Sequence, residues 1–250
     1  MLFIYLYFFI VGIVFGSFFN VVGLRIPLGK SIVFPRSSCP YCGHIIHASE
    51  LVPVFSYLFQ KGKCRKCGAH ISKIYPLIEL ITGLLFVFSI YKIGFQNELF
   101  IALTLISLLV IIVVSDLAYM LIPDRILLFF LPILIIERFF MPLNPWWSSI
   151  VGGVGAFTLL FLIALFSNGG MGGGDIKLFG VLGIILGWKL VLITFTIASF
   201  AGTVYGLAVM RAGKLNKRNP IPFGPFIAIG ALISYFYGNE LLVWYFSILG

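Results

Sequence analysis

Charge is scarce in this chain. Of its 250 residues only 17 are Lys or Arg and 8 are Asp or Glu, so that 10% are charged while 61% are hydrophobic, and the mean hydropathy is +1.13. Soluble domains carry about a quarter charged and about half apolar residues. The composition therefore excludes an ordinary soluble domain. It indicates an all-α polytopic membrane protein, because apolar runs long enough to cross a bilayer as helices recur along the whole length.

Three further absences narrow the interpretation. No basic stretch precedes the first apolar run at residues 2–22, so we expect this run to remain as a membrane helix and not to be removed as a signal peptide. No Gly-Lys-Ser/Thr sequence follows the glycine-rich stretch near residue 170, which excludes a phosphate-binding loop. All three histidines lie in one polar loop, so the apolar segments contain none.

The apolar runs predict about eight transmembrane helices, at residues 2–23, 75–94, 98–116, 121–139, 147–167, 175–187, 189–210 and 223–249. If the N-terminus lies outside, all but three of the 17 Lys and Arg residues fall on the cytoplasmic side, the exceptions being Lys92, Arg138 and Lys189. The positive-inside rule favours this orientation. The net charge of +9 is thus explained by basic residues that fix the membrane orientation and are attracted to anionic lipid. We therefore expect the lipid bilayer as a partner, and no nucleic acid. The sequence does not indicate an oligomeric state.

One segment differs in character from the rest. Residues 25–74 are polar, basic and interrupted by prolines, and they hold all four cysteines. We therefore divide the chain into a first transmembrane helix (1–24), a small cytoplasmic loop domain (25–74) and a membrane-embedded core (75–250).

The cysteines of this loop form two C-x2-C knuckles, each followed by a glycine, and they are Cys39, Cys42, Cys64 and Cys67. Four thiolates at this spacing suit a closed, structural zinc site, and a loop with little core needs such a support. Two disulfides are the alternative, but disulfides seldom persist on the cytoplasmic side. We interpret the three histidines as ordinary loop residues, although any of them is able to replace a cysteine as a zinc ligand.

Two of the eight acidic residues call for a functional explanation. Asp116 ends the third predicted span and Asp175 begins the sixth, so both lie at the cytoplasmic membrane face at a similar depth. Two adjacent carboxylates that share one proton are able to activate water and protonate a scissile carbonyl, as in aspartic proteases. Lys177 places a cation near Asp175. We interpret Asp124, at the start of the next helix, as a carboxylate that interacts with the free backbone N–H groups of that helix end.

Asp175 closes the stretch GGMGGGD at residues 169–175. Glycines have little bulk, so a substrate backbone is able to lie against Gly172 and Gly174 and bond to them. Close helix–loop packing explains the same glycines equally well, and both interpretations stay open here.

Six blocks in order resemble one family, the type IV prepilin peptidases, which are membrane aspartic proteases of the GxGD class. The blocks are GSFFNVVGLRIP from residue 16, the paired cysteine knuckles, YPLIELITG from residue 75, Asp116 ahead of Ile122-Pro123-Asp124, GMGGGDIKL from residue 170, and PFGPFIAIG from residue 222. A lone GxGD is a weak signal, but six blocks over nearly the full length form a strong one.

The resemblance implies eight membrane helices, a bacterial inner-membrane location, and cleavage of the basic leader from prepilins or pseudopilins at the cytoplasmic face. It assigns Asp116 and Asp175 as the catalytic pair. It also implies N-methylation of the new N-terminus with S-adenosylmethionine, an activity associated with the cysteine loop. Members often have a Trp-Asp-Asn-Ile-Pro-like stretch where this chain has HASELVP at residues 47–53, which weakens the inference of methylation more than that of cleavage.

An ion-coupled membrane transporter is the alternative from another class, because paired acids and glycine-broken helices also mark such carriers. Transporter acids are expected near the bilayer midplane and in repeated halves. Here the two aspartates lie at one face, and the sequence shows no convincing repeat.

Overall fold

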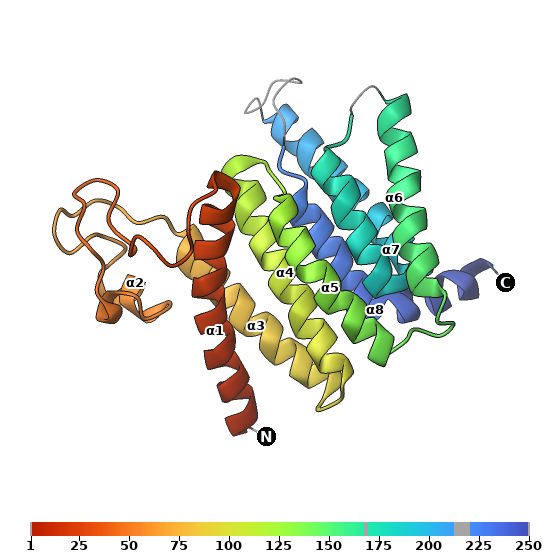
Figure 1. Cartoon of the computed structure of the whole chain (residues 1–250), viewed down its shortest axis with the longest axis horizontal. Helices are drawn as coiled ribbons and strands as arrows, with labels where there is room; N and C mark the ends of the chain where they lie inside the picture. The colour runs from red at the N-terminus through yellow and green to blue at the C-terminus, as the bar shows by residue number, and fades with distance from the viewer. Residues whose placement is uncertain (1, 168–169, 213–220, 250) are drawn as a thin grey trace. The chain divides into compact units, whose positions relative to one another are not determined.

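The structure is a computed structural model that describes residues 2–167, 170–212 and 221–249 (Figure 1). Its helices are α1 (Leu2–Arg25), η1 (Ile26–Leu28), η2 (Ala48–Glu50), α2 (Phe55–Phe59), α3 (Ile74–Ile93), α4 (Glu98–Tyr119), α5 (Asp124–Phe140), α6 (Ser148–Phe166), α7 (Gly173–Arg211) and α8 (Gly224–Leu249). Within these residues only two isolated β-bridges occur, both in the cysteine loop. The expected all-α architecture is confirmed for the described part. Gly169 and the basic residues Lys214, Lys217 and Arg218 lie outside the described residues.

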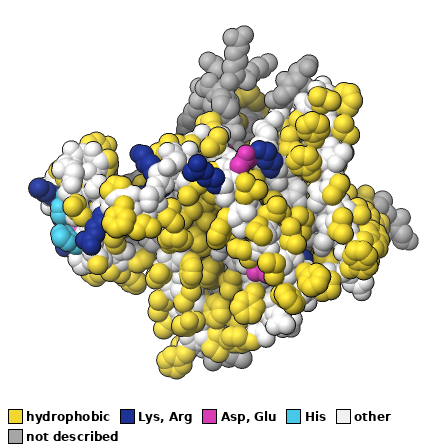
Figure 2. Space-filling model, in the orientation of Figure 1, with side chains coloured by type: hydrophobic (Ala, Val, Ile, Leu, Met, Phe, Trp, Pro, Cys, Tyr) yellow, Lys and Arg dark blue, Asp and Glu magenta, His cyan; other side chains and the backbone are white. Residues whose placement is uncertain are grey.

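Six of the described helices are long and apolar enough to cross a membrane, namely α1, α3, α4, α6, α7 and α8. Helix α5 is 17 residues long and contains Pro132. Many large apolar side chains remain exposed, such as Phe139 at 80% and Phe166 at 82%, and Figure 2 shows hydrophobic side chains over the face in view. Exposed apolar surface of this kind is expected where lipid replaces water as the solvent.

The chain forms two compact units, Met1–Val114 and Ser115–Gly250. In the first unit, α1 packs closely on α3 because both carry glycines at the contact. A Cβ atom placed on Gly12 would lie 2.7 Å from the Cα atom of Gly83, and one on Gly16 would lie 2.8 Å from the Cα atom of Glu79. Small residues allow membrane helices to approach each other in this way.

In the second unit, helix α7 reverses direction at Gly187. This residue has φ 76° and ψ 172°, which lies outside the helical region. Phe179 and Phe195, sixteen positions apart, bring their ring centroids to 5.8 Å, whereas in a straight helix they would be separated by about 24 Å. The two halves of α7 therefore lie side by side, and they coincide with the separate spans predicted at 175–187 and 189–210.

Close contacts also join the halves of α7 to their neighbours. The first half packs on α6, where a Cβ atom on either Gly152 or Gly183 would clash with the backbone of the other residue. The second half packs on α8, because a Cβ atom on Gly230 would lie 2.7 Å from the carbonyl oxygen of Thr194. The division into residues 1–24, 25–74 and 75–250 follows membrane topology and stays a prediction. The two compact units are divided at another place, between Val114 and Ser115 in α4.

Candidate active site

Asp116 lies in the last turn of α4 and is only 5% exposed. Its Oδ2 atom accepts a hydrogen bond of 2.6 Å from the backbone N–H of Gly224, the first residue of α8. A Cβ atom on Gly224 would lie 2.8 Å from the same oxygen. Glycine at this position therefore allows the beginning of α8 to approach the carboxylate and orient it. The sequence motif PFGPF contained this residue, but we had not predicted that it contacts Asp116.

Asp175 lies in the first turn of α7 and is partly buried. Its backbone N–H donates to the carbonyl oxygen of Gly172 at 3.1 Å, which closes the turn that begins the helix. Its carboxylate is near enough to Asp116 for the two charges to interact. Two acids that are 59 positions apart in the sequence thus meet in one place within the second unit, as the sequence had suggested.

The glycines before Asp175 have different surroundings. A Cβ atom on Gly172 would lie 2.9 Å from the Oδ2 atom of Asp175, while one on Gly173 would meet nothing within 4 Å. A Cβ atom on Gly174 would lie 2.8 Å from the Cβ atom of Ile122. Packing against Ile122 thus accounts for Gly174, whereas Gly172 is exposed and keeps the space beside the carboxylate free.

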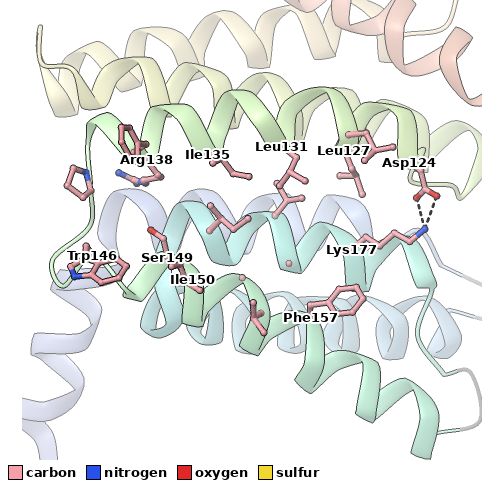
Figure 3. A pocket seen from close by; sticks show the side chains of 18 residues that line it. Asp124, Leu127, Leu131, Ile135, Arg138, Trp146, Ser149, Ile150, Phe157 and Lys177 are labelled. Carbon is pink, nitrogen blue, oxygen red and sulfur yellow. Dashed lines mark hydrogen bonds and ion pairs between the residues drawn. The ribbon is translucent and has the colours of Figure 1, made fainter.

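The neighbouring charges make one contact that the sequence did not predict. The Nζ atom of Lys177 donates to both carboxylate oxygens of Asp124, at 2.7 and 2.8 Å, and not to Asp175 (Figure 3). Asp124 lies in the first turn of α5, as expected, and this lysine binds its carboxylate. Sequence spacing placed Lys177 near Asp175, but two residues along a helix point to different faces. Both charges of this ion pair are about half exposed, so the pair contributes about 0–1 kcal/mol to stability.

The four cysteines of the loop converge as predicted. All four Sγ atoms lie within 4.8 Å of one another, with 3.7 Å between Cys39 and Cys67 and 3.9 Å between Cys42 and Cys64. These thiols are free, so the disulfide alternative is not supported. Zinc–sulfur bonds of about 2.3 Å in a tetrahedron place sulfur atoms about 3.8 Å apart. The four residues therefore fit a closed tetrahedral metal site.

Local electrostatics distinguishes the four thiols. Backbone N–H groups of Cys42 and Tyr41 lower the pKa of Cys39 to about 7, and those of Cys67 and Lys66 lower the pKa of Cys64. At Cys67 the backbone N–H of Ala69 also lowers the pKa. Hydrogen bonding with the Cys42 thiol, desolvation, and contacts with the Cys64 and Cys39 thiols outweigh it and raise the pKa of Cys67 to about 12. Four adjacent thiolates are stable together only beside a cation, which is what a divalent metal supplies.

No histidine of the described loop joins the cysteine cluster. His44 instead contacts the Oε2 atom of Glu50 at 3.2 Å, and the Nε atom of Arg65 lies 3.6 Å from Oε1. The backbone N–H of His47 also donates to Glu50. The hydrogen bond from this N–H is the main cause that lowers the pKa of Glu50, and His44 and Arg65 lower it further. Glu50 thus connects His44, two residues beyond the first knuckle, to Arg65 inside the second.

Another buried acid, Glu79 of α3, contacts the backbone near the end of the loop. Its Oε2 atom accepts a 2.7 Å hydrogen bond from the backbone N–H of Val54. Nearby, the Nδ2 atom of Asn20 donates to the carbonyl oxygen of Tyr75 at 3.2 Å. These contacts explain why polar residues occur inside the apolar blocks at residues 16–27 and 75–83.

Comparison with known proteins gives concordant results. Residues 10–93 match the bacterial peptidase A24 N-terminal domain, and residues 103–207 match the type IV leader peptidase family. The prepilin leader peptidase/N-methyltransferase of Bacillus subtilis (strain 168) is 46% identical over 95% of this chain and 96% of its own length. The protein of the same name from Stutzerimonas stutzeri is 33% identical over 94% of this chain and 91% of its own.

No solved structure matches the chain. The two family matches nevertheless cover both the cysteine loop and the two aspartates, and the curated relatives align over almost the whole length. On these grounds the chain belongs to the type IV leader peptidase family.

Proposed function

We propose that the protein is an aspartic endopeptidase of the bacterial inner membrane that removes the leader from prepilins or pseudopilins. The observation that carries the proposal is the meeting of Asp116 and Asp175 at the ends of α4 and α7. The curated relatives are named for prepilin leader cleavage, which gives the substrate class. They give no support to the transporter alternative.

Asp116 and Asp175 act as the catalytic pair in this proposal. One carboxylate takes a proton from water while the oxygen of that water attacks the scissile carbonyl carbon. The other carboxyl group donates its proton to the carbonyl oxygen. The tetrahedral intermediate then collapses and the C–N bond breaks. The amine leaves with the proton that the first carboxylate took from water, and a hydroxyl proton of the intermediate returns to the second carboxylate. The N–H of Gly224 holds Asp116 in place during these steps.

The substrate backbone runs past Gly172, where the absence of a side chain leaves room beside Asp175. Gly174 belongs to the same proposed binding strip, although its contact with Ile122 also gives it a packing role. A scissile bond must be extended to reach the two carboxylates, and an extended backbone bonds readily to exposed N–H and C=O groups.

The four cysteines hold a structural zinc ion in this proposal, because four thiolates leave no position for substrate. The names of the relatives also include N-methyltransferase. S-adenosylmethionine, when bound, supplies the methyl group for the new N-terminal amine. We assign no residues to that cofactor.

For the topology we propose eight crossings, with the N-terminus outside and the aspartates at the cytoplasmic face. Helix α5 and the two halves of α7 supply the passes beyond the long continuous helices. The reversal at Gly187 supports this count, since it returns the chain to the face where α7 began.

Incubation of the purified protein with a prepilin tests the proposed activity. Intact-mass measurement is expected to show loss of the leader and, when S-adenosylmethionine is added, a further gain of the mass of one methyl group. A product without the methyl group limits the function to cleavage. An unchanged prepilin mass refutes the proposed peptidase function.

A further inference from the structure

The cysteine loop exposes large apolar side chains although it lies outside the membrane spans. The apolar span that precedes the loop ends at Leu28, and the next one begins at Ile74. Between these two residues, the side chains of the short helix α2 stand out, because Phe55, Leu58 and Phe59 are 52%, 64% and 82% exposed. Water is a poor solvent for a patch of this kind, so a contiguous apolar surface marks a contact with a partner or with a membrane.

The three exposed side chains of α2 share one side of the helix. They occupy positions i, i+3 and i+4, which are neighbours on a helical surface. Tyr57 points to the opposite side, where its hydroxyl group donates to the carbonyl oxygen of Ile71 at 3.3 Å. Helix α2 therefore packs on the loop through one side and leaves the apolar side uncovered.

A hydrogen bond to α3 fixes the depth at which α2 begins. The backbone N–H of Val54, the residue before α2, donates to the Oε2 atom of Glu79 at 2.7 Å. Glu79 lies five residues beyond Ile74, which is about 7.5 Å along the axis of α3. Since this part of α3 belongs to a membrane span, α2 begins level with the membrane surface. Helices that lie in the interface bury their apolar side by about 5–10 Å, which agrees with this depth.

A second apolar contact lies at the end of α1. Val33 and Phe34 are 64% and 71% exposed. Their backbone N–H groups donate to the Oγ atom of Ser31, at 3.2 and 3.3 Å. The carbonyl oxygen of Ser31 in turn accepts a 3.1 Å hydrogen bond from the guanidinium group of Arg25, the last residue of α1. These two apolar side chains are therefore also held close to the end of a membrane span.

The charge of the loop favours an anionic lipid surface over a protein as the partner. Residues 25–74 contain eight Lys or Arg residues and a single acid, which is buried. Lys30 and Arg36 flank the contact at the end of α1, and Lys61 and Lys63 follow α2, and all four are exposed. Basic residues beside apolar ones are typical of segments that bind anionic bilayers. The bilayer is also always within reach, because α1 and α3 tether both ends of the loop to it.

We propose that α2 is an interfacial helix that binds the anionic leaflet bordering the loop. Phe55, Leu58 and Phe59 insert between the lipids, and the lysines that follow the helix lie at the level of the phosphate groups. Val33 and Phe34 form the second lipid contact. The cysteine cluster is thereby held at the bilayer surface. This lipid-binding role is separate from the proposed peptidase function.

Lipid capture tests the proposal directly. A photo-crosslinking residue replaces Phe59 or, as the control, Gln60, which follows α2 and points about 100° further round the helix. Each full-length protein is reconstituted in vesicles of phosphatidylcholine and phosphatidylglycerol, with a prepilin added, and intact-mass measurement detects the adducts. We expect at least about fivefold more lipid adduct at position 59 than at position 60. Equal lipid capture, no lipid capture at position 59, or capture of prepilin or of a second copy there instead of lipid overturns the proposal.

Hydrogen exchange gives a second readout with the native side chains. We expect the backbone amides of residues 55–60 to exchange at least about threefold more slowly in vesicles that contain phosphatidylglycerol than in pure phosphatidylcholine. Phe59→Ser should abolish this difference, whereas Phe246→Ser, at a position of α8 that is 64% exposed, should retain it. Equal exchange of the wild-type protein in both kinds of vesicle, or an unchanged difference in Phe59→Ser, overturns the proposal. Neither readout depends on catalysis, so such a result leaves the proposed peptidase function intact.

Discussion

At the scale of single residues, glycines determine how the two carboxylates are presented. Gly224 lets its own N–H reach Asp116, and Gly172 leaves space beside Asp175. Neither glycine has a positive φ, so their role is to provide room and not unusual backbone conformation. A methyl group added at either position would therefore displace a carboxylate while the backbone stays the same.

Gly172 and Gly173 of the glycine-rich motif are expected to differ in their tolerance of alanine. Gly172→Ala would place its Cβ atom 2.9 Å from the Oδ2 atom of Asp175, so the carboxylate must shift by a few tenths of an ångström. Small misplacements of this kind lower turnover by about tenfold or more, since geometry dominates such steps. Gly173→Ala meets nothing within 4 Å and is the control. Steady-state cleavage rates of the two variants check the prediction, and equal rates would contradict it.

At the scale of secondary structure, the break in α7 sets the geometry of the second unit. The apolar run from residue 175 to residue 210 was predicted as two spans, 175–187 and 189–210, and the break in α7 at Gly187 matches this division. The sequence alone did not show what surrounds this glycine. Its Cβ position is occupied by the side chains of Ser148 and Leu143, so α6 and the preceding loop pack against the turn.

Replacing Gly187 is therefore expected to destabilise the fold. Alanine there must adopt φ 76° and ψ 172°, a region used almost only by glycine, at a cost of about 1–3 kcal/mol. Gly155→Ala is the control, because a Cβ atom there meets nothing within 4 Å and alanine favours a helix by about 0.5–1 kcal/mol. Thermal unfolding in detergent should show a lower midpoint for Gly187→Ala only. If Gly187→Ala unfolds at the same temperature as the wild type, a side chain at this position does not strain the turn.

Some parts of the site were predictable from sequence and others were not. The cysteine spacing predicted the cluster, and the positions of Asp116 and Asp175 at helix ends suggested that they meet. The ion pair between Lys177 and Asp124 was not predicted, because ion pairing depends on which helix faces which, and spacing within one helix does not contain that information. The contact between Gly224 and Asp116 was missed for the same reason, since the two residues belong to different helices.

At the scale of the whole molecule, the cysteine cluster and the aspartate pair belong to different compact units. The cysteine loop lies within Met1–Val114, and both aspartates lie within Ser115–Gly250. The loop contains short helices and isolated bridges with few buried apolar side chains. Its folding therefore depends on the metal more than the folding of the second unit does.

Metal removal is expected to affect the two units unequally. A strong chelator should release about one zinc ion per chain and increase hydrogen exchange across residues 37–71. Exchange near Asp116 and Asp175 should remain unchanged. Hydrogen exchange read out by mass spectrometry, with and without chelator, tests this. Loss of protection in both units, or in neither, contradicts a structural metal confined to the loop.

The central claim is that Asp116 and Asp175 together perform the cleavage. The most direct measurement is kcat/KM for a prepilin with purified Asp116→Asn and Asp175→Asn, because asparagine keeps the size of the side chain but does not exchange the proton. Glu240→Gln, an exposed acid of α8, serves as the matched control. We predict that each aspartate variant loses cleavage to the detection limit while the control stays at the wild-type rate. Cleavage near the wild-type rate by either aspartate variant would contradict the account.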